Sequence, residues 1–147
     1  MRTAALLVFV ALLPSGGRLR AQSNSISMTA PGPLTIVSAP AGSNPTSVTD
    51  QSARYSVTVV SGRMRITARL DNPPPAGVTM TISLTAPAGA VSLGTVTLTS
   101  SDQNVVRYIP VGQYPGLTVT LSLAATVTAG AVGYHASNVI LTLSDDP

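Results

Sequence analysis

The chain has 147 residues, a formal net charge of +3, no cysteine and no tryptophan. Three of its eight arginines, Arg2, Arg18 and Arg20, lie in the first 21 residues, so residues 22–147 carry five arginines against five aspartates and are formally neutral. This balance argues against a nucleic-acid binder, which needs a basic surface, and the lack of cysteine excludes a scaffold held by disulfides.

Residues 1–21 have the pattern of a secretory signal peptide. Arg2 gives a positive start, residues 4–13 are an unbroken apolar run, and a polar exit from Pro14 ends at the small residue Ala21. The apolar run is shorter than the roughly 20 residues of a transmembrane helix, and later apolar stretches are interrupted by serine and threonine. We therefore expect cleavage after Ala21, a mature chain without a membrane span, and a location in the periplasm, at the cell surface or outside the cell. An uncleaved N-terminal anchor is the alternative.

Residues 22–52 form an N-terminal segment rich in serine, proline, glycine and asparagine, with short strands and a loop. Ile26, Met28 and Ala30 share one face of a first alternating stretch, and Leu34 and Ile36 share a face of a second. Residues 39–47 are expected to form a loop. The two stretches are either the first strands of the chain's own sheet or an assembly strand that joins the sheet edge of another subunit.

Residues 53–147 are expected to form the body of a β-sandwich. In residues 63–70, Met64, Ile66, Ala68 and Leu70 share one face, which predicts a half-buried strand. A second alternating strand, residues 53–60, precedes it, and Ser61 and Gly62 between them predict a tight antiparallel hairpin. The opposite face carries Arg63, Arg65 and Arg69, a basic stripe that we expect to be solvated or paired with aspartates.

Further strands follow at short intervals along the chain. Residues 78–85 alternate, and the apolar parity of residues 91–100 changes at Gly94, which predicts a bulge or bend. Residues 105–109 predict a short strand, residues 117–127 the longest one, and residues 138–144 the last, with Val139, Leu141 and Leu143 facing inward.

About seven antiparallel strands result, and no window has a helical period. This pattern predicts an all-β chain with a single immunoglobulin-like β-sandwich, residues 22–147 forming one domain; a jelly roll or a small barrel stays open.

Catalytic, cofactor and metal sites find little support in the composition. His135 is the only histidine, and glutamate is absent as well as cysteine, so the usual general-base pairs and metal clusters cannot be assembled. Asp145 and Asp146 form a terminal acidic pair that we expect to be solvated. The chain is therefore predicted not to be an enzyme, and no cofactor is expected.

Tyrosines are the only aromatic residues beyond Phe9. Tyr108 and Tyr114 flank one loop, and Tyr134 lies beside His135 in another. These four residues are the candidate ligand loops of a monomeric glycan- or protein-binding module, and the alternative is that the tyrosine hydroxyls serve the structure.

The C-terminal pattern of Gly133 and Tyr134 followed by Val139, Leu141, Thr142 and Leu143 resembles the closing strand of small exported bacterial sandwich proteins of the spore-coat-U and archaic chaperone–usher pilin type. The resemblance implies a structural subunit of surface fibres or coats. The function expected is accordingly that of a non-enzymatic structural or adhesive surface protein that associates with itself or with another surface protein. A monomeric binding module is the alternative.

Overall fold

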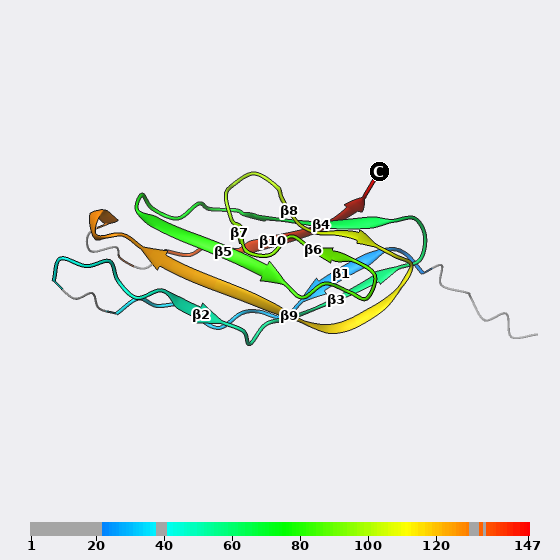
Figure 1. The fold of residues 1–147 in the computed structure, drawn as a ribbon, viewed down its shortest axis with the longest axis horizontal. Coiled ribbons are helices and arrows are strands. Elements are labelled where there is room, and N and C mark those ends of the chain that lie inside the picture. The colour runs from blue at the N-terminus through cyan, green and yellow to red at the C-terminus, as the bar shows by residue number, and fades with distance from the viewer. Residues whose placement is uncertain (1–21, 38–40, 130–132, 134) are drawn as a thin grey trace, which may run out of the picture.

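The structure is a computed structural model that describes residues 22–37, 41–129, 133 and 135–147 (Figure 1). The expected signal peptide, residues 1–21, lies outside these residues. The described part of the chain contains ten β-strands and one short 3-10 helix, Val127–Ala129, and holds no helix long and apolar enough to cross a membrane. The prediction of an all-β chain is confirmed, whereas ten strands replace the seven expected.

The first sheet has the order β1-β3-β9-β5-β7, with β2 beside β9. Its strands are β1 (Ser25–Met28), β2 (Val48–Asp50), β3 (Arg54–Val59), β5 (Val78–Leu84), β7 (Val96–Thr97) and β9 (Gly112–Ala125). All pairs are antiparallel. Alternation predicted a long strand over residues 117–127; β9 begins five residues earlier, at Gly112, so Tyr114, expected beside a loop, lies within the strand. β9 forms the centre of this sheet because β2 and β3 pair successively along one edge while β5 pairs with the other.

The second sheet has the order β10-β4-β8-β6. It consists of β4 (Met64–Leu70), β6 (Val91–Ser92), β8 (Gln103–Ile109) and β10 (Val139–Asp145), again all antiparallel. The two sheets pack face to face and form an elongated sandwich (Figure 1).

The hairpin predicted between β3 and β4 is wrong. β3 belongs to the first sheet and β4 to the second, so Ser61 and Gly62 carry the chain across the sandwich, with Gly62 at φ 77°. The same crossing occurs at every later connection, because successive strands from β3 to β10 alternate between the two sheets. A short glycine-containing break suits either connection, and the pairing partners that each strand finds decide between them.

The core lies between the two sheets. Its largest fully buried side chains include Tyr55, Ile66, Leu70, Ile82, Leu84, Ile109 and Leu121. The Tyr55 hydroxyl donates a 2.5 Å hydrogen bond to the carbonyl of Thr85, and burial raises the pKa of this phenol. The strand faces that alternation placed inward in residues 63–70 and 117–121 are those that fill this core.

The parity change at Gly94 has a larger cause than the bulge or bend expected. Gly94, at φ 75°, lies where the chain leaves β6 in the second sheet and enters β7 in the first. Val91 and Leu93 before it are about half exposed, whereas Leu98 after it is buried. The apolar face of residues 91–93 therefore points to solvent.

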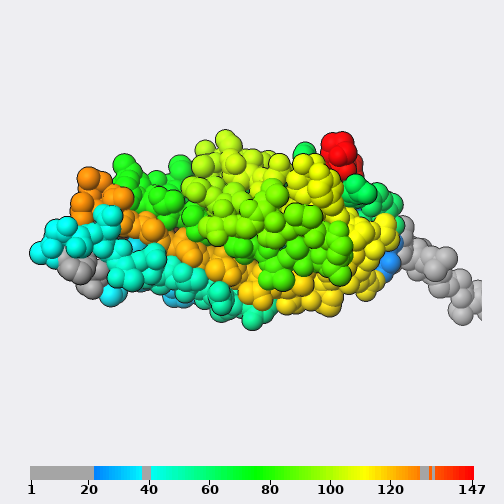
Figure 2. Space-filling view, viewed as in Figure 1, coloured from blue at the N-terminus to red at the C-terminus, as the bar shows by residue number. Residues whose placement is uncertain are grey.

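The N-terminal segment contributes less regular structure than its alternation suggested. The first stretch forms β1, but residues 32–37 form no strand, and β2 lies at Val48–Asp50 instead. In Figure 2 the residues around β2 lie against the C-terminal part of β9. The hydroxyls of Thr49 on β2 and Ser122 on β9 form a 2.9 Å hydrogen bond between the two strands. Residues 39 and 40 of the expected loop lie outside the described part.

Candidate functional site

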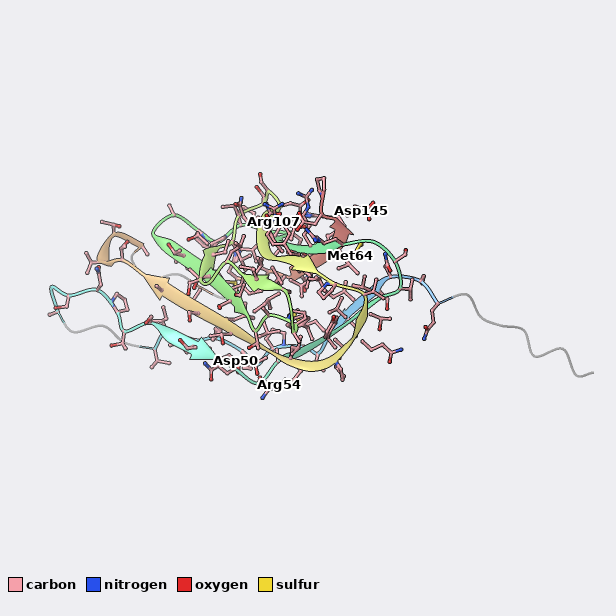
Figure 3. The ribbon with its side chains drawn as sticks, turned by 45° about the vertical axis from the view of Figure 1, so that its right-hand side comes forward. Asp50, Arg54, Met64, Arg107 and Asp145 are labelled. Atoms are coloured by element: carbon pink, nitrogen blue, oxygen red, sulfur yellow. The ribbon has the colours of Figure 1, made fainter. Side chains whose placement is uncertain are left out.

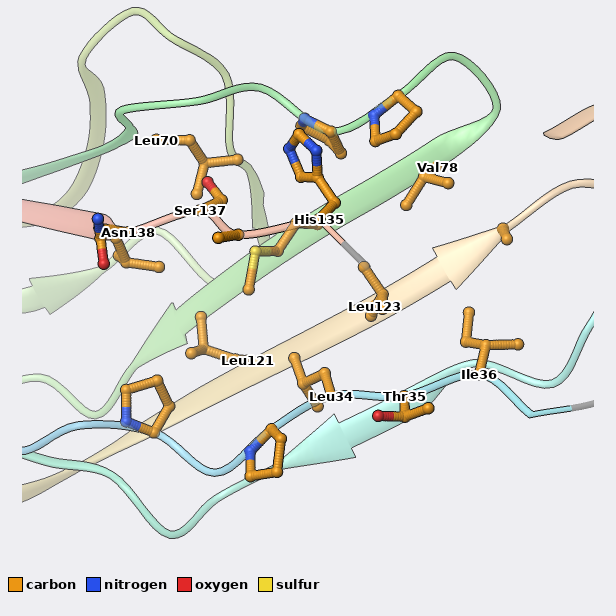
Figure 4. A pocket seen from close by; sticks show the side chains of 18 of the residues that line it. Leu34, Thr35, Ile36, Leu70, Val78, Leu121, Leu123, His135, Ser137 and Asn138 are labelled. Carbon is orange, nitrogen blue, oxygen red and sulfur yellow. The ribbon is translucent and has the colours of Figure 1, made fainter. Parts of the chain in front are cut away.

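An apolar cavity of about 960 Å³ lies at one end of the sandwich (Figure 4). We call it the cleft. Val78 and Met80 of β5 and Leu121 and Leu123 of β9 form its floor. Two irregular segments lie beside this floor as walls: residues 29–36, which follow β1, on one side and residues 135–138 on the other. The cleft thus exists because both walls stand outside the sheets.

Asp50 holds the first wall. Its carboxylate accepts hydrogen bonds from the Gly32 backbone N–H at 3.1 Å and from the Ser52 hydroxyl at 2.9 Å. The pKa of Asp50 is held below its usual value by hydrogen bonds to its carboxylate, first from the Ser52 hydroxyl and then from the backbone N–H groups of Ser52 and Gly32. Thr29 and Arg54 exchange two further bonds, each at 2.8 Å, so the wall is fastened at both ends of residues 29–32.

Asp71 holds the second wall. The backbone N–H and the side-chain amide of Asn138 both donate to its carboxylate at 2.7 Å, and they hold the pKa of Asp71 below its usual value. Ser137 donates to the Asn72 carbonyl at 2.6 Å, and the Asn72 amide donates to the Ala136 carbonyl at 3.1 Å. Residues 136–138 are therefore tied to the loop that follows β4.

A narrower groove of about 320 Å³ continues from the cleft between β1 and β10. Its lining consists of Ile26, Ser27, Met28, Val139, Ile140 and Leu141, and Met28 and Val139 line the cleft as well. β1 and β10 are edge strands of opposite sheets. The cleft and the groove together make one side of the sandwich apolar and incompletely covered.

The opposite end of the molecule, which we call the closed end, is built around an ion pair between a partly exposed arginine and a buried aspartate. Arg107 reaches Asp146 at 2.5 Å, and Asp146, whose side chain is inaccessible to solvent, also accepts the Tyr108 backbone N–H at 2.8 Å. Arg107 is the main cause of a lowered pKa at Asp146. The expectation that this terminal aspartate is solvated is wrong, because a strand 38 residues earlier supplies its partners. Figure 3 shows Arg107 and Asp145 on the side of the second sheet, and Asp50 and Arg54 on the side of the first.

The basic stripe of β4 is largely engaged in contacts. Arg69 pairs with Asp102 at 3.6 Å, as expected for a stripe with aspartates nearby, and Arg65 donates to the Ser144 hydroxyl at 3.2 Å. Arg63 precedes β4, and its guanidinium lies 5.5 Å from the centre of the Tyr108 ring. Among the described residues Arg69 is the one arginine of the three with a carboxylate partner, so the charge of the stripe is paired only in part.

The predicted ligand-loop residues lie at both ends of the molecule. Tyr108, 40% exposed and at φ 62°, stacks with Arg107 at the closed end. Tyr114 lies nearby, and its hydroxyl donates to the Pro110 carbonyl at 3.2 Å, which is a structural use. His135 lines the cleft, and Tyr134 lies outside the described residues. The length of β10, roughly 20 Å, separates the two groups, so the structure does not bring them into one site.

The candidate assembly strand belongs to the chain's own first sheet in this structure. Ile26 and Met28 lie on β1, opposite Val57 and Tyr55 of β3, and their side chains are partly buried against the core. Ala30 follows the strand and lines the cleft.

Within the part of the chain that is described, no three His, Cys, Asp or Glu side chains gather as a metal site would require. The described lining of the cleft contains no acidic residue, no arginine and no phenylalanine, tyrosine or tryptophan, and His135 is its one titratable side chain. The geometry therefore suits the binding of apolar groups better than acid–base chemistry or the stacking of sugars.

Sequence reasoning missed the cleft altogether. Its walls are irregular segments held by Asp50 and Asp71, and a strand period gives no signal for a segment that stands beside a sheet. The prolines at positions 31, 33, 74 and 75, which all line the cleft, were the available hint, because consecutive or closely spaced prolines cannot pair in a ladder.

Comparison of the chain with protein-family models, with curated proteins and with solved structures finds no match.

Proposed function

We propose that this chain is a non-enzymatic, exported structural or adhesive subunit that associates with further copies through the open edge of β10. The observation that carries the proposal is a seven-residue edge strand, Val139–Asp145, paired on one side only among the described residues. An exposed edge of this length is a template for another extended chain.

The backbone of β10 offers a regular set of groups to an incoming strand. Asp71 donates its N–H to the Asn138 carbonyl and Asp146 donates to the Arg63 carbonyl, in the same register that places Val139 opposite Leu70. The backbone N–H and C=O groups of successive residues in an antiparallel strand point alternately to its two sides. The backbone groups of residues 140, 142 and 144 therefore bond to β4, and those of residues 139, 141 and 143 point away from β4 to the open edge. Thr29 donates its backbone N–H to the Arg54 carbonyl, in the register of β1 with β3. By the same alternation, the backbone groups of residues 26 and 28 of β1 point away from β3.

The other side of the sandwich is protected in a way that β10 is not. Its edge strands, β6 and β7, are two residues long, which leaves little ladder for a partner. β10 contains no proline, lysine or arginine, the residues that usually blunt an edge, and its one charged residue is Asp145 at the end. Association is therefore favoured on the side of β1, β10 and the groove.

Composition and pattern support the remaining parts of the proposal. One histidine and no cysteine or glutamate favour a chain without catalysis, and the pattern of residues 1–21 favours export. The resemblance to spore-coat-U and archaic pilin subunits likewise supports a structural subunit that associates with further copies. The immunoglobulin-like type stays a prediction. The alternation of successive strands between the sheets differs from the usual immunoglobulin order, in which some neighbours in sequence share a sheet.

The test is the solution mass of the exported protein, measured by light scattering after size exclusion over a range of concentrations. We expect oligomers or fibres for the unmodified protein and a monomer for Thr142→Lys, because this variant adds a positive charge to the exposed β10 edge. Thr97→Lys on the two-residue edge β7 is the matched control and should assemble normally. A monomeric unmodified protein, or equal assembly of both variants, would refute the proposal.

A chain that lacks residues 22–31 identifies the incoming strand. If its circular dichroism is that of a folded sandwich and it still assembles, the strand is β10 of a second copy. If it is folded and monomeric, the assembly strand is the one that carries Ile26, Met28 and Ala30.

A further inference from the structure

We propose that the cleft binds one aliphatic chain, the alkyl or acyl tail of an amphiphile such as a fatty acid. The inference does not rest on strand addition at β10, since the cleft is lined mainly by β5, β9 and the two walls; only the adjoining groove is shared with β1 and β10.

The first argument is the chemistry of the lining. Leu34 and Ile36 approach from the first wall, Leu123 and Val78 from the floor, and Leu70 lies beyond the second wall (Figure 4). An ionised or phosphorylated ligand would find no arginine or lysine there, and a sugar ring would find no aromatic face among the described lining residues. Aliphatic side chains on three sides match a saturated chain.

The second argument is shape. The volume of about 960 Å³ lies in the range of ligand cavities, and Met28 and Val139 line both the cleft and the smaller groove between β1 and β10. A cleft that adjoins a groove at two shared residues suits a flexible chain, which can extend from the cleft past Met28 and Val139. A compact ligand of the same volume would leave the groove empty.

The third argument is the placement of polar groups. His135 lies at the rim on the second wall, where Ser137 and Asn138 are already bound to Asn72 and Asp71. The imidazole is thus the side chain at this rim that can bond a carboxyl or ester head group. A tail in the cleft and a head beside His135 would give the amphiphile one orientation.

Burial of methylene groups would supply the affinity. Each methylene removed from water should tighten binding roughly fourfold until the cleft and groove are filled, after which longer chains should gain nothing. Such a plateau measures the length of the site.

The experiment is a titration of the exported protein with parinaric acid, a fluorescent fatty acid, followed by displacement with saturated fatty acids of increasing length. The chain has no tryptophan, so protein emission interferes little. We expect saturation at one probe per chain and displacement that strengthens with chain length and then levels off.

Two neighbouring alanines of β9 provide the matched variants. Ala125 lines the cleft, and Ala124 points to the opposite face because successive strand residues alternate. Ala125→Phe should fill part of the cleft and weaken probe binding at least tenfold, whereas Ala124→Phe should bind as the unmodified protein does. Circular dichroism of both variants shows whether the fold is kept.

Absence of saturable binding by the unmodified protein overturns the inference, as does equal binding by the two variants. Thr142→Lys should bind the probe normally, so failure of assembly and failure of the cleft are separable. If phospholipid vesicles compete as well as the free acids do, the tail comes from a membrane lipid; if they do not, it comes from a free fatty acid.

Discussion

The two ends of the sandwich are built from the same alternating strands, but they are closed to different degrees. Towards the closed end, Leu84 of β5 and Val119 of β9 are fully buried. Towards the cleft, Met80 and Leu123 occupy equivalent positions on the same strands and remain partly exposed. Alternation therefore predicts which face of a strand turns inward, but the segments that pack over that face decide how far it is buried.

The largest expected effect comes from Leu121 and Leu123, which share one face of β9. Leu121→Ala should lower the free energy of unfolding by about 2–5 kcal/mol, because this side chain is fully buried in the core even though it also reaches the floor of the cleft. Leu123→Ala should cost about 1–2 kcal/mol, because it only widens a cleft that is already open. Urea unfolding followed by circular dichroism measures both. Equal losses would mean that the cleft is closed in solution.

Glycines give the next comparison. A Cβ added at Gly112 would lie 2.7 Å from the Tyr114 hydroxyl at the closed end, so Gly112→Ala should displace this ring and cost about 1–3 kcal/mol. A Cβ added at Gly133 at the cleft meets nothing within 4 Å, and Gly133→Ala should be close to neutral. The midpoints of thermal unfolding test the pair, and a harmless Gly112→Ala would show that Tyr114 packs elsewhere.

The carboxylate of Asp146 should make the stability of the closed end depend on pH. The pKa of Asp146 is lowered from 3.8 in the folded protein, so its stabilising contribution is present above that value and is lost as the pH falls through the folded pKa. Asp146→Asn should therefore be clearly less stable than the unmodified protein at pH 7, and the difference should shrink below about pH 3.8. A difference that is independent of pH would argue against the ion pair with Arg107.

The smallest effect is expected at the second wall of the cleft. Asp71 is exposed, so Asp71→Asn should leave global unfolding nearly unchanged. It should instead speed hydrogen exchange at the Asn138 amide, which donates to this carboxylate, while exchange in β9 stays constant. Uniformly faster exchange would place Asp71 within the global folding unit.

The sequence allowed the strands and much of the core to be predicted, because Met64, Ile66 and Leu70, or Val119 and Leu121, recur with a period of two. It did not allow the partners of each strand to be predicted, since Ser61 and Gly62 suit a hairpin as well as a crossing. The pair of Arg107 and Asp146 was missed for the same reason. Residues that meet only after two sheets have packed leave no local signal.

The alternation of successive strands between sheets also governs when the chain can fold. No two consecutive strands from β3 to β10 pair with each other, so ladders must close over long stretches of sequence, and folding of this kind is slow. β4 pairs on one side with β8 and on the other with β10, which is the sixth strand after it along the chain. A nascent chain in which residues 139–145 have not yet been made would leave one side of β4 unpaired, so the second sheet can be completed only after residue 145.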